Sequence, residues 1–408
     1  MLVLVVNAGS SSLKSQLIET DTHELLVKCH AEKAECHDAY MTISYAPGWN
    51  KTRYDMPHAT VREFLTRFIL IMRDDPECPL DDLHKLAGIG NRIVAGGEWF
   101  TESCIVDKQA RENLEKCEEL APLHNPHADD CIDLLHTVLP DVPLVTVFDT
   151  AFHSTMPKKS FLFPIPMRYY EQYHIRRYGA HGTSHEYAAK QAALMLGKPI
   201  EETKLITCHL GNGGSISAVL GGKCIDTSMG LTPLDGIMMG TRCGSIDPAI
   251  VPFIMRRENM TPDEVDTLMN KKSGLLGISG VSGDMRDVFA HAEAGNEQCK
   301  LALEMYTYRI EKYVGSYYAI LGGCDAIVFT AGIGENSPFV RASICDTLSH
   351  LGFMIDHELN DAELNVGHEN GNMEISKPES PIKIYVIPAD EEMCIADETA
   401  RLVASLDE

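Results

Sequence analysis

Positive charge is scarce in this sequence. Its 408 residues include 35 Lys and Arg against 59 Asp and Glu, which gives a formal net charge of −24. Because this excess of negative charge repels phosphate backbones and anionic lipid, it argues against a nucleic-acid-binding or membrane-surface protein. An anionic substrate would have to meet positive charge locally, so individual arginines are informative here.

Metal-type cysteine pairs and long apolar runs are also missing. None of the 13 cysteines lies in a Cys-x-x-Cys pair, which predicts reduced thiols in a cytoplasmic protein. No run reaches the roughly 20 apolar residues that a membrane helix needs. The apolar start, residues 1–6, lacks a basic leader and predicts a buried strand rather than a signal peptide. The length and the 44% hydrophobic content predict a globular protein with at least two cores.

Short β-branched runs alternate with helical patterns, which predicts an α/β fold. The predicted strands are residues 2–6, 144–148, 204–208, 326–330 and 383–387. Thr261, Pro262 and Glu264 form a capping box that predicts a helix ending near Gly274. Apolar residues at helical spacing predict one long helix that includes residues 303–321.

Glycine- or serine-rich turns follow three of the predicted strands, at residues 7–12, 209–215 and 332–336. Backbone N–H groups in such turns can approach phosphate oxygens closely. None matches the Walker pattern or a complete Rossmann fingerprint, so each alone is also compatible with a simple turn. Together they favour a nucleotide site. The first two form similar strand–turn–strand openings, which predicts a duplicated domain with a ligand cleft between the copies.

Several charged residues occupy positions typical of active sites. Asp149 follows a predicted strand, where α/β active sites gather, although a helix cap or a surface turn is the alternative. Arg92 and Arg242 lie among glycines, and an arginine fork matches phosphate and carboxylate groups. These three residues are the first candidates for binding an anion.

Two histidines lie beside predicted helix N-termini. His181 precedes a helix that Thr183 and Glu186 are expected to cap. His124 precedes Asn125 and Pro126, which are expected to be the cap and the first residue of another helix. Acidic residues, Glu391 among them, open the last predicted helix, where they ordinarily complement the helix dipole.

Six stretches together resemble the signature sequences of acetate kinases. They are residues 7–14 (NAGSSSLK), 148–153 (FDTAFH), 178–185 (YGAHGTSH), 209–214 (HLGNGG), 239–242 (MGTR) and 332–336 (GIGEN). The resemblance implies two duplicated actin-like (ribonuclease H-like) domains with a central cleft. The first domain would comprise residues 1–150 plus 388–408, and the second, nucleotide-binding domain residues 151–387.

The resemblance also implies an activity: the reversible transfer of the ATP γ-phosphoryl group to acetate, giving acetyl phosphate and ADP. The cofactor would be Mg²⁺, with Mn²⁺ as a substitute, and the enzyme a cytoplasmic homodimer that binds neither nucleic acid nor membrane. Residue by residue, the catalytic set would be Arg92, Asp149, His181 and Arg242. The acyl substrate would meet Arg92, Val94, Leu123, His124 and Pro233, and the metal would be held by Asn7 and Glu391. ATP would be bound by Lys14, His209, Leu210, Gly211, Asn212, Gly213, Asp284, Met285, Arg286, Gly332, Ile333, Gly334, Glu335 and Asn336.

Three positions depart from the family pattern. Asn91 and Ala95 stand where the family usually has histidines around the substrate arginine, and Asp390 stands where it commonly has asparagine. Because Asn91 can hydrogen-bond but Ala95 cannot, we expect weaker support for Arg92 and a raised Michaelis constant for the carboxylate. Asp390 adds negative charge beside the proposed metal ligand.

Alternative functions stay open at this stage. A propionate or butyrate kinase is the closest, since one methylene is worth only about 1–3 kcal/mol in a pocket. A non-catalytic, ATP-gated protein of the Hsp70 or actin type would have no need of Arg92 and Arg242. Because a carboxylic acid with a pKa of roughly 4–5 is already ionised at neutral pH, we expect Asp149 to orient groups rather than remove a proton.

Overall fold

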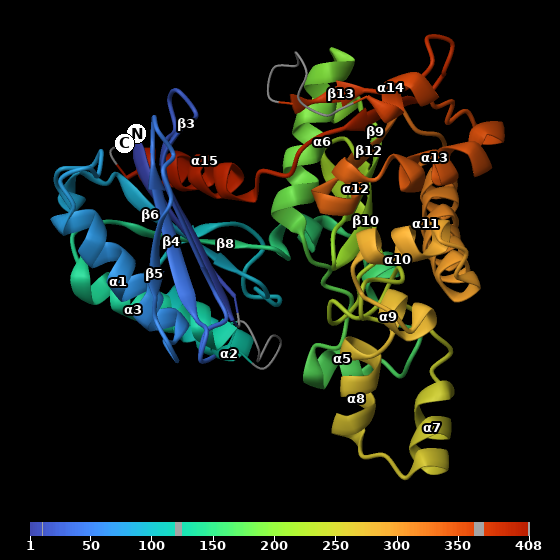
Figure 1. Ribbon diagram of the computed structural model, residues 1–408, viewed down its shortest axis with the longest axis horizontal. Coiled ribbons are helices and arrows are strands. Elements are labelled where there is room, and N and C mark those ends of the chain that lie inside the picture. The colour runs from blue at the N-terminus through green and yellow to red at the C-terminus, as the bar shows by residue number, and fades with distance from the viewer. Residues whose placement is uncertain (10, 119–124, 363–370, 407–408) are drawn as a thin grey trace. The chain divides into compact units, whose positions relative to one another are not determined.

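The computed structural model describes residues 1–9, 11–118, 125–362 and 371–406, and the chain divides into two compact units. Unit 1 comprises Met1–Phe152 and Asp390–Glu408, and unit 2 comprises His153–Ala389 (Figure 1). Each unit contains one mixed β-sheet with helices, as the alternating sequence pattern predicts.

Unit 1 contains an eight-stranded sheet in the order β5-β4-β3-β2-β1-β6-β8-β7. Its strands are β1 (Leu2–Ala8), β2 (Ser12–Glu19), β3 (Glu24–Glu32), β4 (Tyr40–Tyr45), β5 (Thr52–Asp55), β6 (Gly88–Ile93), β7 (Cys104–Ile105) and β8 (Leu144–Phe148). Its helices are α1 (Val61–Asp74), α2 (Lys108–Cys117), α3 (Asn125–Val138) and α15 (Glu391–Ala404). Strands β1, β6 and β8 are parallel, so their carboxyl ends meet at one edge of the sheet.

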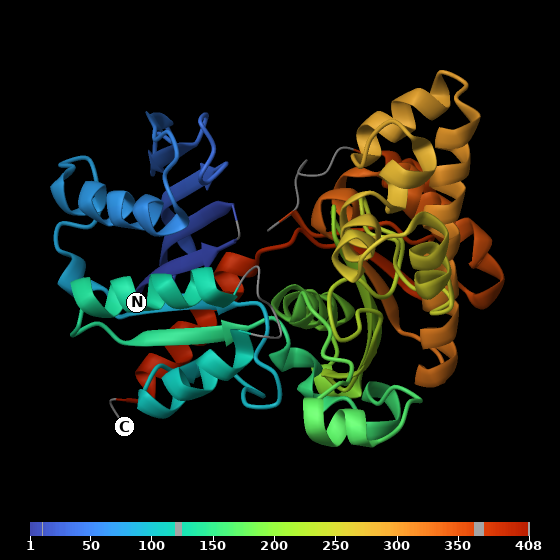
Figure 2. The same cartoon turned by 90° about the horizontal axis from the view of Figure 1, so that it is seen from below.

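Helix α15 returns to unit 1 and packs against β1, β6 and β8, as Figure 2 shows for the red C-terminal segment. Glycines make this contact close: a Cβ at Gly90 would lie 2.4 Å from Thr399 Oγ1 and 2.6 Å from Ile395 Cγ2. Side chains alternate along a strand, so the residues next to Gly90 point to the other face. There Ile89 and Ile93 join the large apolar core that also contains the buried side chains of α1 and α3.

Unit 2 repeats this sheet pattern. Its order is β11-β10-β9-β12-β14-β13, so the antiparallel run β11-β10-β9 and the parallel strands β9, β12 and β14 match β3-β2-β1 and β1, β6 and β8 of unit 1. The strands are β9 (Lys204–Leu210), β10 (Gly214–Leu220), β11 (Lys223–Thr227), β12 (Ala326–Thr330), β13 (Met373–Glu374) and β14 (Lys383–Val386). The repeated order is the signature of the actin-like α/β fold expected from the sequence.

The described part of unit 2 also contains eleven α-helices. They are α4 (Lys158–Phe161), α5 (Arg168–Tyr173), α6 (Gly182–Leu196), α7 (Ile250–Glu258), α8 (Pro262–Lys271), α9 (Gly274–Ser279), α10 (Met285–Glu293), α11 (Glu297–Leu321), α12 (Ala331–Asn336), α13 (Pro338–Thr347) and α14 (His357–Asp361). Of these, α5, α7 and α8 extend away from the sheet (Figure 1). Ile206, Cys208 and Leu210 of β9 share a core with buried residues of α11. The alternate residues Thr207 and His209 face the other way and bond to side chains of α6.

Most predicted elements are confirmed. All five predicted strands are present, the Thr261 capping box begins α8, and the long helix is α11. Three local predictions are wrong. Gly274 does not end α8 but begins α9, with φ +62°, and residues 331–336 form the short helix α12 rather than a turn.

The third error concerns α6. Its N-cap is His181, in the left-handed conformation with φ 59°, and no side chain caps the helix. The expected capping box is absent: Thr183 Oγ1 is buried without a hydrogen-bond partner in the described structure, and Glu186 instead pairs with Lys190 at 2.7 Å.

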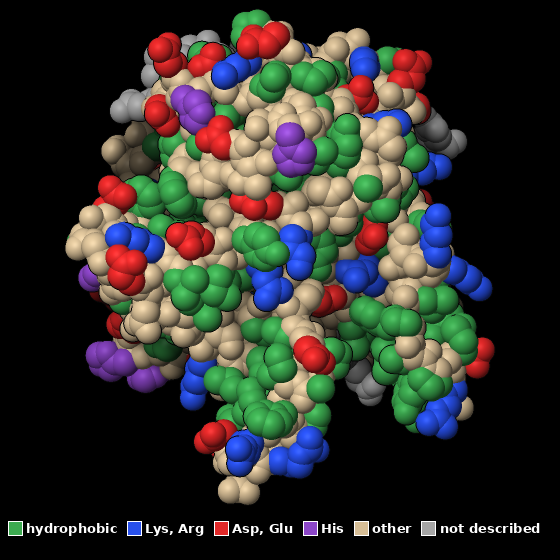
Figure 3. All heavy atoms as spheres, turned by 90° about the vertical axis from the view of Figure 1, so that its right-hand side faces the viewer, with side chains coloured by type: hydrophobic (Ala, Val, Ile, Leu, Met, Phe, Trp, Pro, Cys, Tyr) green, Lys and Arg blue, Asp and Glu red, His purple; other side chains and the backbone are tan. Residues whose placement is uncertain are grey.

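The surface of unit 2 mixes acidic and basic side chains (Figure 3). Hydrophobic side chains gather at its lower end in that view, and the exposed ones in the α5–α7 region include Met167, Tyr173 and Phe253. All 13 cysteines are free thiols. Among the described helices, none combines the length and apolar character needed to cross a membrane.

Candidate active site

The carboxyl ends of β1, β6 and β8 gather one arginine and its partners in unit 1. Arg92 Nε and Nη2 donate to the two carboxylate oxygens of Asp149 at 2.8 and 2.6 Å, and Arg92 Nη1 donates to Asn7 Oδ1 at 3.0 Å. The parallel register explains this convergence, because it aligns strand ends that are far apart in sequence. Asp149 is therefore a bidentate partner of Arg92, and the alternative of a helix cap is wrong.

The N-terminus of α15 adds two carboxylates to this cluster. Glu391 Oε2 lies 3.7 Å from Arg92 Nη1, and Asn7 Nδ2 donates to Glu392 Oε1 at 3.4 Å. Burial alone would lower the pKa of Arg92, but the charges of Asp149 and Glu391 outweigh it and raise that pKa above its ordinary value. Arg92 is thus a permanent cation held by two acidic side chains. Asp390, the charge that departs from the family pattern, accepts from the backbone N–H of Met393 at 3.0 Å as the N-cap of α15.

The cluster in unit 1 offers oxygen ligands for a divalent cation. In the described residues, no group of three or more His, Cys, Asp and Glu side chains is arranged to hold a metal. The amide oxygen of Asn7 and the carboxylates of Asp149 and Glu391 nevertheless surround Arg92. Mg²⁺ is commonly held by one or two carboxylates together with waters and substrate phosphates. The donor set therefore has the oxygen chemistry that a hard cation prefers.

Asn125, which the sequence predicts to be a helix cap, supports the loop after β6. Asn125 donates from Nδ2 to the carbonyls of Ala95 and Cys117 at 2.8 and 3.1 Å, and its Oδ1 accepts from the Ala95 N–H at 3.2 Å. The expectation that Asn91 supports Arg92 is wrong. Asn91 lies on the opposite face of β6 from Arg92, and its buried amide has no partner in the described structure. Val94 is half-buried in this loop. The predicted substrate contacts Leu123 and His124 lie outside the described residues.

Unit 2 brings together four of its predicted site residues. The His181 ring stacks on His209, with centroids 4.0 Å apart and an interplanar angle of 17°. A Cβ at Gly213 would lie 3.3 Å from Arg242 Nη1 and 3.8 Å from His181 Nε2, so the glycine leaves a small space that both groups border. Arg242 is a cation without a carboxylate partner in the described structure, and burial lowers its pKa. Such a cation is prepared to receive an anion.

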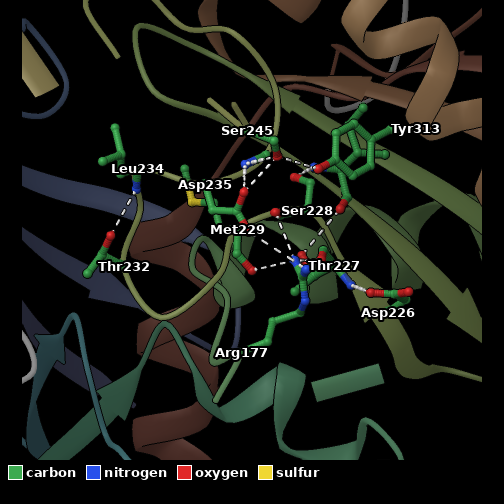
Figure 4. Close-up of polar contacts among 12 residues, drawn as sticks. Arg177, Asp226, Thr227, Ser228, Met229, Thr232, Leu234, Asp235, Ser245 and Tyr313 are labelled. Atoms are coloured by element: carbon green, nitrogen blue, oxygen red, sulfur yellow. Dashed lines mark hydrogen bonds and ion pairs between the residues drawn. The ribbon is translucent and has the colours of Figure 1, made fainter. Parts of the chain in front are cut away.

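Arg177 holds the loop that carries Pro233 and Arg242 (Figure 4). The sequence pattern did not identify this arginine as a candidate site residue. Arg177 Nη1 donates to the carbonyls of Thr227, Ser228 and Met229 at 2.6, 2.9 and 3.0 Å, and Nη2 lies 3.7 Å from Asp235. Arg242 Nη1 in turn donates to the Pro233 carbonyl at 3.4 Å.

The same loop is tied to α11. Asp235 Oδ1 accepts from the Ser245 hydroxyl at 2.6 Å, and that hydroxyl also lies 3.0 Å from the Tyr313 hydroxyl (Figure 4). Tyr313 belongs to α11, whose tyrosines the helical spacing alone would place in the core. The position of Arg242 is therefore fixed from both sides of its loop.

Unit 2 also contains a pocket of about 950 Å³, and its lining residues include sequence neighbours of His209 and Gly213. Eight residues expected to bind ATP line it: Gly211, Asn212, Asp284, Met285, Arg286, Gly332, Ile333 and Asn336. Phe289, Pro338 and Phe339 add apolar lining. An apolar pocket with a few polar groups is typical of nucleotide-base and small-ligand sites.

Four other residues that were expected to bind ATP are not among the residues that line this pocket. Leu210 is fully buried in the core, and Gly334 packs against the backbone of Phe329. Glu335 accepts from the Ala389 N–H at 2.9 Å, and burial raises its pKa. Lys14 is exposed on β2 in unit 1.

The duplicated sheets, the nucleotide-sized pocket and the half-buried arginines define an actin-like phosphotransferase. The model of the acetokinase family matches residues 2–397, and the chain belongs to that family. The acetate kinase of Halothermothrix orenii is 47% identical over 406 residues, which are 99% of this chain and 100% of that protein. The crystal structure of Porphyromonas gingivalis acetate kinase is similar with a TM-score of 0.92 and 38% identity, over 98% of this chain and 99% of that one. A propionate kinase from Francisella tularensis has a TM-score of 0.90 and 40% identity over the same shares of the two chains.

Proposed function

We propose that this chain catalyses the reversible, Mg²⁺-dependent transfer of the γ-phosphoryl group of ATP to acetate, giving acetyl phosphate and ADP. The observation that carries the proposal is the pairing of Arg242 with His181 around Gly213. A half-buried guanidinium and an imidazole there offer positive charge and a hydrogen-bond donor, which a transferring phosphoryl group requires.

The two units divide the work in this proposal. The pocket of unit 2 would take the nucleotide, with its base among Met285, Phe289 and Phe339. Arg92 would bind the acetate carboxylate: three of its five N–H groups donate to Asp149 and Asn7, which leaves one N–H on each terminal nitrogen for a second anion. Val94, in the loop after β6, would contact the methyl group.

Asp149 would orient Arg92 rather than remove a proton, since acetate is already ionised at neutral pH. Its two hydrogen bonds to Arg92 support this role. Asn7 and Glu391 would hold Mg²⁺ or Mn²⁺, and the bound cation would neutralise part of the charge of the ATP phosphates.

Trapping with hydroxylamine tests the reaction, because an acyl phosphate reacts with it to give a hydroxamate. We expect acetohydroxamate from ATP, Mg²⁺ and acetate, with a lower kcat/KM for propionate and lower still for butyrate. An Arg242→Ala variant should lose most of the activity. A preference for propionate would identify the second substrate class. Nucleotide binding without hydroxamate from any of the three acids would point to an ATP-gated binding protein instead.

We further propose that the chain forms a cytoplasmic homodimer. The exposed hydrophobic side chains of unit 2, such as Phe253 of α7, provide apolar surface for such contact. Size-exclusion chromatography with light scattering should give twice the chain mass of 45.1 kDa, and a mass equal to one chain at micromolar concentration would contradict the proposal.

A further inference from the structure

A continuous chain of side-chain hydrogen bonds runs from strand β9 to the N-terminus of α6. Thr207 Oγ1 lies 2.7 Å from His185 Nδ1, His185 Nε2 lies 2.7 Å from Ser215 Oγ, and Ser215 Oγ lies 2.8 Å from His181 Nδ1. Thr207, His185 and Ser215 are completely buried, so bulk water does not reach them.

The direction of each hydrogen bond follows from counting protons. Burial holds the pKa of His185 well below its ordinary value, so its ring is neutral and carries one N–H. Thr207 Oγ1 has no partner in the described structure except His185 Nδ1. Its hydroxyl proton is therefore used only if Thr207 donates to Nδ1, since the opposite direction would leave a buried O–H unpaired.

The rest of the chain is then determined. With Nδ1 of His185 accepting, its proton is on Nε2 and is donated to Ser215 Oγ. Ser215 has one hydroxyl proton, which it donates to His181 Nδ1. His181 consequently accepts at Nδ1 and carries its proton on Nε2, the nitrogen that borders Gly213 together with Arg242 Nη1.

We infer that Thr207, His185 and Ser215 are positioning residues that hold His181 in the Nε2–H tautomer, so that this N–H donates to the phosphoryl group being transferred. The inference rests on the proposed function for the role of His181, but the tautomer itself does not. A donor with a fixed direction beside a guanidinium stabilises charge that develops in the transition state without first having to reorient.

Nitrogen NMR of the full-length protein, labelled with ¹⁵N-histidine, tests the tautomer directly. A His181→Gln variant assigns the signals. We expect Nδ1 of His181 to resonate as an unprotonated nitrogen and Nε2 as a protonated one at neutral pH. In Ser215→Ala the two nitrogens should move towards averaged shifts. A protonated Nδ1 in the unaltered protein would overturn the inference, whatever the enzyme's activity.

Kinetics test the consequence for catalysis. Ser215→Ala should lower kcat about tenfold or more while changing either KM less than about twofold, since a supporting residue of this kind typically contributes 10–100-fold. Ser217→Ala is the matched control, because Ser217 is equally buried on β10 and bonds to Thr227 rather than to a histidine. Equal kcat values for the two variants would overturn the inference.

A second pair of variants protects the test against misfolding. Thr207→Ser keeps the hydroxyl and should retain kcat, whereas Thr207→Val keeps the shape and should lower it. If Thr207→Ser and Thr207→Val have the same kcat, the Thr207 hydroxyl does not act on His181 and the inference is overturned. Failure of the unaltered protein to form acyl phosphate would refute the proposed function instead, and the NMR result would still stand alone.

Discussion

Replacing Asn91 by leucine should stabilise unit 1, although it removes a polar residue next to Arg92. Asn91 is 2% exposed, and neither its Nδ2 nor its Oδ1 has a hydrogen-bond partner in the described structure. Its neighbours on the same face of β6, Ile89 and Ile93, belong to the apolar core. Leucine has nearly the same shape as asparagine and no polar atoms.

The expected size follows from the cost of an unsatisfied group. A buried donor or acceptor without a partner costs about 1–3 kcal/mol, so Asn91→Leu should raise the free energy of unfolding by about that amount. Asn125→Leu is the matched control, because Asn125 is 3% exposed but makes three hydrogen bonds. With each bond worth about 1 kcal/mol and backbone groups left unpaired, that variant should lose about 2–4 kcal/mol.

Urea unfolding followed by tryptophan fluorescence measures both variants. The chain has two tryptophans, Trp49 and Trp99, and both belong to unit 1, so the signal reports the unfolding of that unit. The kcat of Asn91→Leu should stay unchanged, because Asn91 faces away from Arg92. Destabilisation of both variants by similar amounts would refute the reasoning.

Three further predictions follow from particular contacts. Burial lowers the pKa of His153 from 6.5 to about 4, so between these pH values the unfolded chain binds a proton that the folded chain does not. Acidification from pH 7 to pH 4 should therefore lower the free energy of unfolding by about 3 kcal/mol through this residue. The His153→Gln variant should lack this loss, and equal pH profiles of the two proteins would contradict the prediction. Arg177→Lys keeps the charge but cannot reach three carbonyls at once. Its kcat should therefore fall about tenfold, and amide hydrogen exchange in residues 228–245 should accelerate. Unchanged hydrogen exchange would exclude Arg177 as the residue that holds the loop in place. Ala95→His should lower the Michaelis constant for acetate if a histidine there adds support to Arg92, and an unchanged constant would remove that idea.

The sequence predicts the strands well, for physical reasons, and it picks out candidate residues at the strand ends. Buried parallel strands are short β-branched runs, and polar residues directly after them, such as Asp149, stand out against those runs. The bidentate pair of Arg92 and Asp149 could not be predicted from spacing, because the parallel register of β6 and β8 joins residues far apart in the chain.

Other features escape local patterns because tertiary contacts decide them. Asn125 begins a helix and looks like a cap, but its amide bonds to the loop at Ala95 instead. The glycine-rich residues 332–336 are typical of a turn, but residues 331–336 form the helix α12. The hydrogen-bonded chain from Thr207 to His181 did leave a signal, because Thr207 and Ser215 are polar residues in strands that are largely buried and apolar.

Isotope transfer tests the central claim most directly, namely that this chain moves a phosphoryl group onto a carboxylate oxygen. Acetate labelled with ¹⁸O is incubated with the protein, ATP and Mg²⁺, and the products are followed by ³¹P NMR. The proposed reaction predicts acetyl phosphate with ¹⁸O between carbon and phosphorus, formed together with one equivalent of ADP. Formation of ADP and inorganic phosphate without labelled acyl phosphate would contradict it.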